Sequence, residues 1–261
     1  KCALDLVKSK GGHTFALVNN NDSYIYNTCE FKMDIEAGLE KSIAATKSFT
    51  GGVLCLWLIA LYIAQNKGFD VSQHLFLLKN IETDIDFVIE NIKNIDEAAN
   101  LLSGLKAFPV VGYGYNYVIA KEGALKIKET SYIDVNAYPT GEFLHGHTAI
   151  LNENSVILEV FTSSMGGFEV KTLDKIKKDY SPKIVAITDI EPDCEKLSNC
   201  GEGLKPYKDA FLTVQFKRFD DEILRILALI VVLQLLALNI AQKLGRNVDK
   251  PIGLNKVVGE G

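Results

Sequence analysis

Apolar positions along this chain follow two spacings, one typical of strands and the other of helices. Short apolar runs of strand length occupy residues 13–18, 29–35, 107–111, 132–137, 156–161, 183–188 and 210–216. Longer segments, with apolar residues at helical spacing, lie at 1–11, 45–66, 69–105, 112–132, 168–179 and 222–244. Strands that alternate with helices predict parallel α/β layers.

One sequence pattern occurs twice. Residues 60–68, A-L-Y-I-A-Q-N-K-G, resemble residues 237–245, A-L-N-I-A-Q-K-L-G, at an offset of 177 positions. Each copy ends a series of strand, loop, strand and long helix, so we expect two copies of one α/β unit. The second copy would run from about residue 107 to 245. A first copy of equal length would begin about 70 residues before Lys1, and we expect the front of that unit to be missing from this sequence.

Composition describes a globular protein and excludes several partners. The chain has 261 residues, 48% of them hydrophobic, with 6 prolines, which suits one large or two modest domains. The net charge is -5, and no basic block is present. Nucleic acid and acidic membranes are therefore not expected as partners, and an anionic substrate would need local donors.

The cysteines bear on the cellular compartment, and one long apolar segment raises the question of a membrane span. Five cysteines, without CxxC spacing, argue against a disulfide framework or a zinc site. A reducing cytoplasm fits them. Residues 223–241 are long enough to span a membrane, but Arg225, Gln234 and Asn239 interrupt them. We interpret this segment as a buried core or interface helix.

Ionisable residues concentrate among apolar ones between residues 110 and 150. Within this stretch Glu122, Lys126 and Glu129 are spaced by four and three residues, which places them on one face of the predicted helix. Small neighbours such as Gly123 and Ala124 predict close packing, which would partly desolvate these charges and displace their pKa values. A solvated, salt-bridged helix face is the alternative.

A loop with two of the four histidines follows the next predicted strand. It contains Pro139, Gly141, Glu142, His145, Gly146 and His147. Glu142, His145 and His147 could bind a metal, yet no further cluster completes a coordination shell, so we predict no metal.

Gly112 and Gly114 suggest a dinucleotide turn, but Tyr117 replaces the third glycine, and no cofactor is predicted.

Several segments together resemble one family. The run E-G-A-L-K-I-K-E-T-S-Y-I at 122–133, followed by A-Y-P-T-G-E-F-L-H-G-H at 137–147, resembles the signature of the SIS (sugar isomerase) family. The resemblance is to the isomerase half of glucosamine-6-phosphate synthase and its stand-alone relatives. E-K-S-I-A-A-T-K-S-F-T at 40–50 and D-K-P-I-G-L-N-K-V at 249–257 are similar to two further family segments.

The resemblance implies an architecture. We expect two SIS-type three-layer α/β/α units with parallel, flavodoxin-like sheets, the first incomplete at its N-terminus. Residues 1–90 would complete the first unit, 91–245 would form the second, and 246–261 would be a tail that closes over the active site. In the family a loop at the front of the first unit holds the phosphate. Residues 162–167, T-S-S-M-G-G, are a local candidate from their position, although an ordinary N-capped helix start is the simpler interpretation.

The resemblance also implies residue roles. Glu129 would be the base that moves a proton between C1 and C2, Glu122 and Lys126 would tune it, and His145, given to the neighbouring subunit's site, would open the sugar ring. Lys256 would act on the open-chain carbonyl, as a Schiff-base amine or as a cation beside the enediolate. Pro251 and Gly253 would free the tail to fold back, with apolar anchors at Leu254, Val257 and Val258. The substrate-binding candidates are Ala44, Ala45 and Thr46.

The expected reaction is aldose–ketose isomerisation of an amino-sugar or keto-sugar phosphate of the glucosamine 6-phosphate and fructose 6-phosphate type. Ala45 stands where the synthase has serine, which favours a deaminase with ammonia release. The alternatives are a fructosamine 6-phosphate deglycase, the isomerase domain of a synthase, or a non-catalytic sugar-phosphate sensor. Because the helices at 45–66 and 222–244 are apolar almost all round, we expect at least a homodimer.

Overall fold

The computed structural model describes residues 1–163, 168–190 and 210–255, with the side chains of 168–170 left aside. Contacts between Cα atoms divide the chain into a first unit, Lys1–Leu77, and a second unit, Leu78–Gly261. Each unit is described by itself below. The three segments expected from the sequence, 1–90, 91–245 and 246–261, stay a prediction.

The first unit pairs two parallel strands and ends in a long helix. Its strands are joined in register from Phe15 opposite Phe31 to Val18 opposite Asp34. Its elements are α1 (Cys2–Ser9), β1 (Phe15–Val18), α2 (Tyr24–Thr28), β2 (Phe31–Asp34), α3 (Lys47–Asn66) and the start of α4 (Ser72–Asn91). The predicted order of strand, loop, strand and long helix is therefore present. Helix α2 was not predicted, and the Ser23 hydroxyl caps it by accepting from Tyr26 N–H.

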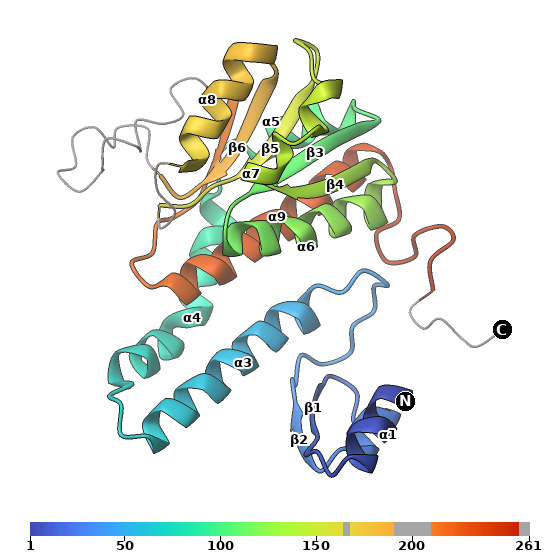
Figure 1. Ribbon diagram of the computed structural model, residues 1–261, viewed down its shortest axis with the longest axis vertical. Helices are drawn as coiled ribbons and strands as arrows, with labels where there is room; N and C mark the ends of the chain where they lie inside the picture. Colours follow the sequence, from blue (N-terminus) through green and yellow to red (C-terminus); the bar gives the residue numbers. More distant parts are fainter. Residues whose placement is uncertain (164–167, 191–209, 256–261) are drawn as a thin grey trace. The chain divides into compact units, whose positions relative to one another are not determined.

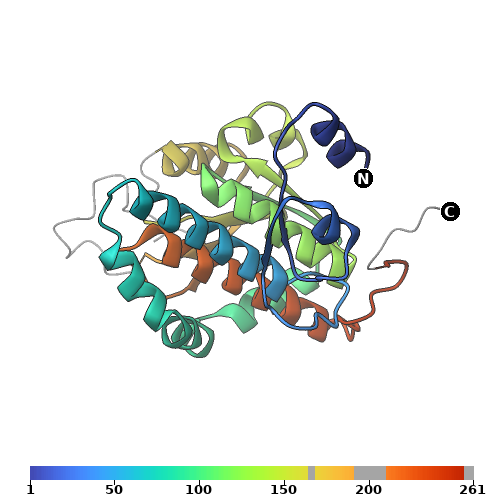
Figure 2. The ribbon, with the colours of Figure 1, turned by 90° about the horizontal axis from the view of Figure 1, so that it is seen from below.

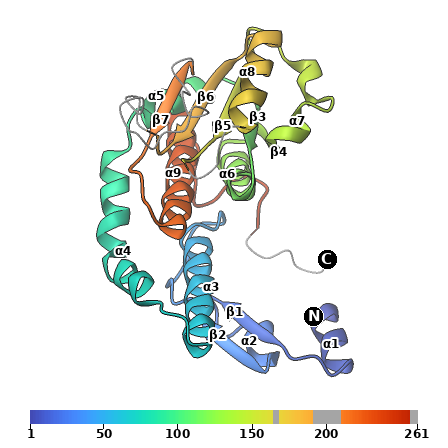
Figure 3. The same ribbon diagram turned by 60° about the vertical axis from the view of Figure 1, so that its left-hand side comes forward.

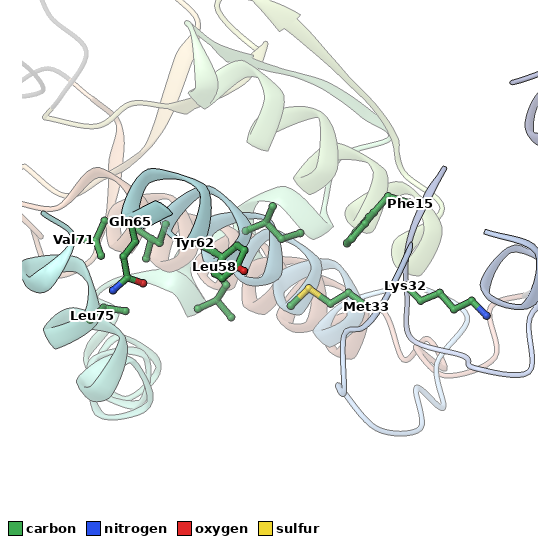
Figure 4. Close-up of a pocket in the computed structure, with 10 residues that line it drawn as sticks. Phe15, Lys32, Met33, Leu58, Tyr62, Gln65, Val71 and Leu75 are labelled. Carbon is green, nitrogen blue, oxygen red and sulfur yellow. The ribbon is translucent and has the colours of Figure 1, made fainter. Parts of the chain in front are cut away.

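Helix α3 is apolar but poorly covered in the described structure. Its buried residues are Cys55, Trp57 and Leu61. An open apolar cavity of about 530 Å³ lies along α3 beside β1 and β2 (Figure 4). Its lining includes Phe15, Met33, Leu58, Tyr62 and Leu75. With two strands, the small sheet covers a limited part of the helix.

The second unit is a parallel sheet with strand order β4-β3-β5-β6-β7. This is the flavodoxin-like order, and it confirms the expected α/β class with a parallel sheet. Its elements after α4 are α5 (Ile95–Ser103), β3 (Ala107–Gly112), α6 (Tyr115–Ser131), β4 (Asp134–Pro139), α7 (Thr140–Phe143), the 3-10 helix η1 (His147–Ile150), β5 (Val156–Val160), α8 (Phe168–Tyr180), β6 (Lys183–Thr188), β7 (Leu212–Gln215) and α9 (Glu222–Lys243).

Helices cover both faces of this sheet (Figures 1 and 3). On one face α9 lies between α5 and α6, as Figure 2 shows from below. On the other face α7 and α8 enclose a core that includes Val111, Phe143, Ile157 and Ile176. The second unit is thus a three-layer α/β/α unit. That the first unit is an N-terminally incomplete copy of the same architecture stays a prediction.

Two details differ from the sequence prediction. The amphipathic segment 69–105 is broken at Asn94, whose φ of 61° is left-handed, so α4 and α5 are separate helices. The predicted loop at 139–147 contains α7 and the start of η1. Thr140 and Phe143 of α7 are buried, because the short helix packs on the sheet and α8.

Two helices of the described chain, α3 and α9, are long and apolar enough to cross a membrane by length and composition. The two helices differ in how many of their residues are buried. Thirteen residues of α9 are buried in the second unit, including Arg225, which confirms the interpretation of 223–241 as a buried helix. Arg225 pairs with the buried Asp189 at 3.0 Å, so the charge inside this apolar segment has a partner.

Candidate active site

Helix α6 begins directly after strand β3 through a turn that requires glycine. A Cβ atom at Gly112 would lie 2.9 Å from the backbone of Asn116 and Tyr117. Gly114, at the N-cap position, has a φ of 57°. These two glycines let the chain turn tightly, so α6 starts at the carboxyl edge of the sheet, where ligands bind in open α/β folds. The strand, turn and helix predicted here are confirmed.

Glu122, Lys126 and Glu129 form a charged triad on α6. The Lys126 ammonium donates a hydrogen bond to Glu129 Oε2 at 2.7 Å and lies 3.5 Å from Glu122 Oε1. Their side chains are 5%, 16% and 23% exposed in the order Lys126, Glu122, Glu129. The triad is therefore a partly buried cluster, and the alternative of a fully solvated helix face does not hold.

Helix α6 packs closely on α9 at Gly123, the residue that follows Glu122. A Cβ atom at Gly123 would lie 2.9 Å from the Leu233 side chain, so the two helices approach as closely as glycine allows. Ala124 and Ile127, beside the triad, are also buried. Burial raises the pKa of Glu122, and the nearby Lys126 ammonium offsets part of that rise. The prediction of a displaced pKa is confirmed for this carboxyl.

The arrangement suits proton transfer. Lys126 fixes the orientation of Glu129 and neutralises part of the negative charge of two neighbouring carboxylates. Glu129 is the more exposed of the two carboxylates, so a ligand can reach it from solvent. A carboxyl with a raised pKa, such as Glu122, can hold a proton closer to neutral pH than an ordinary glutamate.

The two histidines of the loop after β4 have different surroundings. His145 is exposed, and its backbone N–H donates to the Glu142 carbonyl at 2.9 Å. His147 packs on aromatic rings, with its centroid 4.2 Å from that of Tyr138 and 6.1 Å from that of Phe143. Both histidine side chains are exposed, and the ring contacts of His147 connect the loop to Tyr138 and Phe143. Within the described chain, no group of three or more potential ligands lies close enough to hold a metal.

In the first unit, Ala44, Ala45 and Thr46 precede α3. Ala44 is buried, while Ala45 and Thr46 are partly exposed. The Glu40 carboxylate accepts hydrogen bonds from Thr46 N–H at 2.8 Å and Ser48 N–H at 3.3 Å, which caps the helix. The Thr46 amide is therefore engaged within the protein. A substrate-binding role for these three residues stays a prediction.

The candidate anion loop at 162–167 is described at Thr162 and Ser163, and its other residues lie outside the described chain. The Thr162 hydroxyl bonds the Asn116 side chain and lies 3.2 Å from Tyr115 OH. Ser163 donates from both its N–H and its hydroxyl to the buried Asp189 carboxylate. These donors are occupied internally, which favours the simpler interpretation of a structural helix start.

The C-terminal tail shows a contact that sequence reasoning missed. Lys256, Val257 and Val258 lie outside the described residues, and the predicted anchor Leu254 is 38% exposed. The phenol oxygen of Tyr132, at the end of α6, accepts a hydrogen bond from Ile252 N–H at 2.6 Å. These residues are 120 positions apart, so no local pattern could have revealed the pair.

Comparison with known proteins finds one matching family model and several relatives. Residues 102–193 match the model of the SIS domain. The glutamine–fructose-6-phosphate aminotransferase [isomerizing] of Bacteroides thetaiotaomicron is 32% identical over 263 residues, and that of Campylobacter jejuni is 28% identical over 258 residues. Each alignment covers 98% of this chain and 40% of the relative. The chain therefore spans less than half the length of these relatives.

Two solved structures have folds similar to that of this chain. The C-terminal domain of glucosamine-fructose-6-phosphate aminotransferase from Francisella tularensis superposes with a TM-score of 0.81 and 25% identity, covering 95% of this chain and 68% of that one. Glucosamine-6-phosphate deaminase from Thermotoga maritima superposes with a TM-score of 0.67 and 20% identity, covering 98% and 70%. The second similarity shows a shared fold.

Proposed function

Because residues 102–193 belong to the SIS domain family, we propose that this chain catalyses the isomerisation of a phosphosugar. The substrate class is an amino-sugar phosphate or the corresponding keto-sugar phosphate, of the glucosamine 6-phosphate and fructose 6-phosphate type. The relatives named for fructose 6-phosphate support this class.

The observation that carries the proposal is the charged triad on α6. A sensor that only binds sugar needs no base, whereas isomerisation must move a proton between C1 and C2. Glu129 is the proposed base. Its Oε2 atom lies 2.7 Å from the Lys126 ammonium, and its side chain is partly exposed to solvent. Glu122, whose pKa is raised by burial, and Lys126 set the electrostatic environment of that base.

Two further groups complete the proposed mechanism. His145, exposed on its loop, is assigned the proton transfer that opens the sugar ring, with His147 holding the loop on Tyr138. Lys256 is assigned to the open-chain carbonyl, as an amine nucleophile or as a cation beside the developing oxyanion. Ala44, Ala45 and Thr46 are assigned to substrate binding.

Three reactions fit this site and differ in what happens to nitrogen. The aminotransferase relatives favour the isomerase half of a glutamine-dependent synthase. Ala45, which replaces a serine of that family, favours deamination of glucosamine 6-phosphate with release of ammonia. A fructosamine 6-phosphate deglycase would use the same acid–base groups.

We further propose that the protein works as a homodimer in the cytoplasm. Exposed apolar side chains on α3, such as Leu56, Tyr62 and Ile63, support a partner surface in the assembled protein. A monomer at micromolar concentration in sedimentation experiments would refute the dimer.

The function is tested with full-length protein and a panel of sugar phosphates. Ammonia release from glucosamine 6-phosphate without glutamine supports the deaminase, and ammonia release from fructosamine 6-phosphate supports the deglycase. Formation of glucosamine 6-phosphate from fructose 6-phosphate, with glutamine as the nitrogen donor and glutamate as the second product, supports the synthase half. Binding of these sugars without any turnover would refute the enzyme and leave a sensor.

A further inference from the structure

We propose that Tyr132 is a positioning residue that anchors the C-terminal tail, residues 244–255, on the end of α6. The anchor follows from contacts within the second unit. Its consequence for catalysis rests on the proposed function, since it concerns the placement of the tail that leads to Lys256.

The tail leaves α9 along a defined path. Gly245 has a φ of 64°, and Arg246 N–H donates to the Ala241 carbonyl at 2.9 Å, which ends the helix and reverses the chain. The Asn247 side chain then accepts from the N–H groups of Asp249 at 3.0 Å and Lys250 at 3.2 Å. Local hydrogen bonds therefore shape the tail before it reaches α6.

Two tail residues use different parts of the Tyr132 side chain. The phenol oxygen accepts from Ile252 N–H at 2.6 Å, and the Arg246 guanidinium carbon lies 4.7 Å from the ring centroid. The first contact is a short hydrogen bond, and the second is within cation–π range. Pro251, between these contacts, is buried, whereas Ile252 is 80% exposed. The tail is thus held through the Ile252 backbone, the Arg246 charge and Pro251, and not through an apolar side chain at Ile252.

Tyr132 adopts a backbone conformation that an aromatic residue does not favour. It caps α6 with a φ of 65°, where glycine or asparagine is usual, and its N–H donates to the Lys128 carbonyl at 3.0 Å. A left-handed tyrosine is strained, and this conformation persists where surrounding contacts hold it. The two tail contacts are such contacts.

The anchor lies close to the charged triad along the chain. Tyr132 follows Glu129 by one helical turn, so its backbone is fixed by the helix that carries the triad. Lys256 follows Ile252 by four positions, and covalent geometry limits the distance between their Cα atoms to about 14 Å. Fixing Ile252 therefore limits how far from this anchor the chain can carry the residue assigned to the open-chain carbonyl.

Tyr132→Phe in the full-length protein removes the acceptor and keeps the ring. The matched control is Tyr117→Phe on the same helix, whose ring also has a cation above it, Lys121 at 5.8 Å. Hydrogen exchange is measured by mass spectrometry on peptides covering residues 247–255. Because one hydrogen bond is lost, exchange at the Ile252 amide should rise about fivefold in Tyr132→Phe and stay unchanged in Tyr117→Phe. Arg246→Gln should raise it about twofold.

Turnover of the same variants then tests the consequence. For Tyr132→Phe, kcat should fall about tenfold with KM for the sugar phosphate within about twofold, because positioning and not binding is lost. Unchanged tail exchange in Tyr132→Phe would overturn the anchor, and faster exchange with unchanged kcat would overturn its positioning role. If the wild-type protein turns over none of the sugars, the proposed function fails while the exchange comparison still decides the anchor.

Discussion

Helices α3 and α9 share a sequence pattern but differ in burial. At the repeat offset, Leu56 of α3 corresponds to Leu233 of α9, and Ile63 corresponds to Ile240. Leu56 and Ile63 are 59% and 49% exposed, whereas Leu233 and Ile240 are 1% and 0% exposed. Apolar composition therefore does not report burial by itself.

The sheets explain the difference. Helix α9 lies on a unit with five strands and is flanked by α5 and α6, whereas the sheet of α3's unit has two strands in the described chain. Helix α9 packs on α6 so closely at Gly123 that a Cβ atom there would lie 2.9 Å from Leu233, and the partly buried triad begins at the preceding residue, Glu122.

The matched leucines give the largest expected contrast. Leu233→Ala should lower the free energy of unfolding by about 2–5 kcal/mol, because it opens a cavity in a closed core. Leu56→Ala should change it by less than about 0.5 kcal/mol, because that side chain is already in solvent. Denaturant unfolding of both variants checks this. Because Leu56 belongs to the proposed dimer surface, both variants are compared at concentrations where the protein is monomeric, and an equally large loss at Leu56 in the monomer would break the comparison.

Two lysines of α6 test the desolvation of the triad. Lys126→Met leaves two partly buried carboxylates without their cation and should destabilise the protein by about 3 kcal/mol. Lys128→Met, two residues further on, removes a 43% exposed lysine and should cost less than about 1 kcal/mol. Thermal unfolding of the pair measures the contrast, and similar costs would show that the triad is solvated.

Two helical glycines test the packing itself. An alanine at Gly123 would meet Leu233 at 2.9 Å, so Gly123→Ala should destabilise the protein by about 1 kcal/mol or more. At Gly52 of α3 the nearest atom, from Ile35, is 3.7 Å away. Gly52→Ala should therefore stabilise by about 0.5–1 kcal/mol through helix propensity. Opposite signs in denaturant midpoints support the comparison, and a gain at Gly123 would contradict it.

The smallest expected effect is a pH dependence that comes from Glu122. Because the pKa of this carboxyl is raised in the folded state, folding is favoured while it is protonated. Its contribution is present below the unfolded pKa, about 4.3, and is lost as pH rises through the folded pKa. Glu122→Gln should therefore flatten the dependence of melting temperature on pH above about 4.3. Parallel profiles of wild type and variant would show that Glu122 is not desolvated.

Much of the fold could be predicted from the sequence because its signals are local. Strand β6 begins and ends where the apolar run does, and α9 ends within one residue of its predicted end. Helix α2 was missed because a single Ser23 cap starts it. The strand order and the different coverage of α3 and α9 depend on contacts distant in sequence.

The triad could be predicted because spacings of four and three residues fix which side chains share a helix face. Small neighbours such as Gly123 predicted that Lys126 would be partly removed from solvent. The link between Tyr132 and Ile252 could not, because it depends on how the tail turns after α9. The occupation of the Thr46 amide by Glu40 was also missed, because a glutamate six residues before the N-cap residue is not a recognised cap.

The central claim, that the α6 triad is an acid–base site, is tested most directly by the turnover of Glu129→Gln. The variant keeps the size of the side chain and removes its ability to accept a proton, and Glu153→Gln at an exposed position is the control. We expect kcat on the preferred sugar phosphate to fall by about 10²–10⁴ in Glu129→Gln while the variant still folds, and to stay at the wild-type value in the control. Full turnover by Glu129→Gln would contradict the assignment.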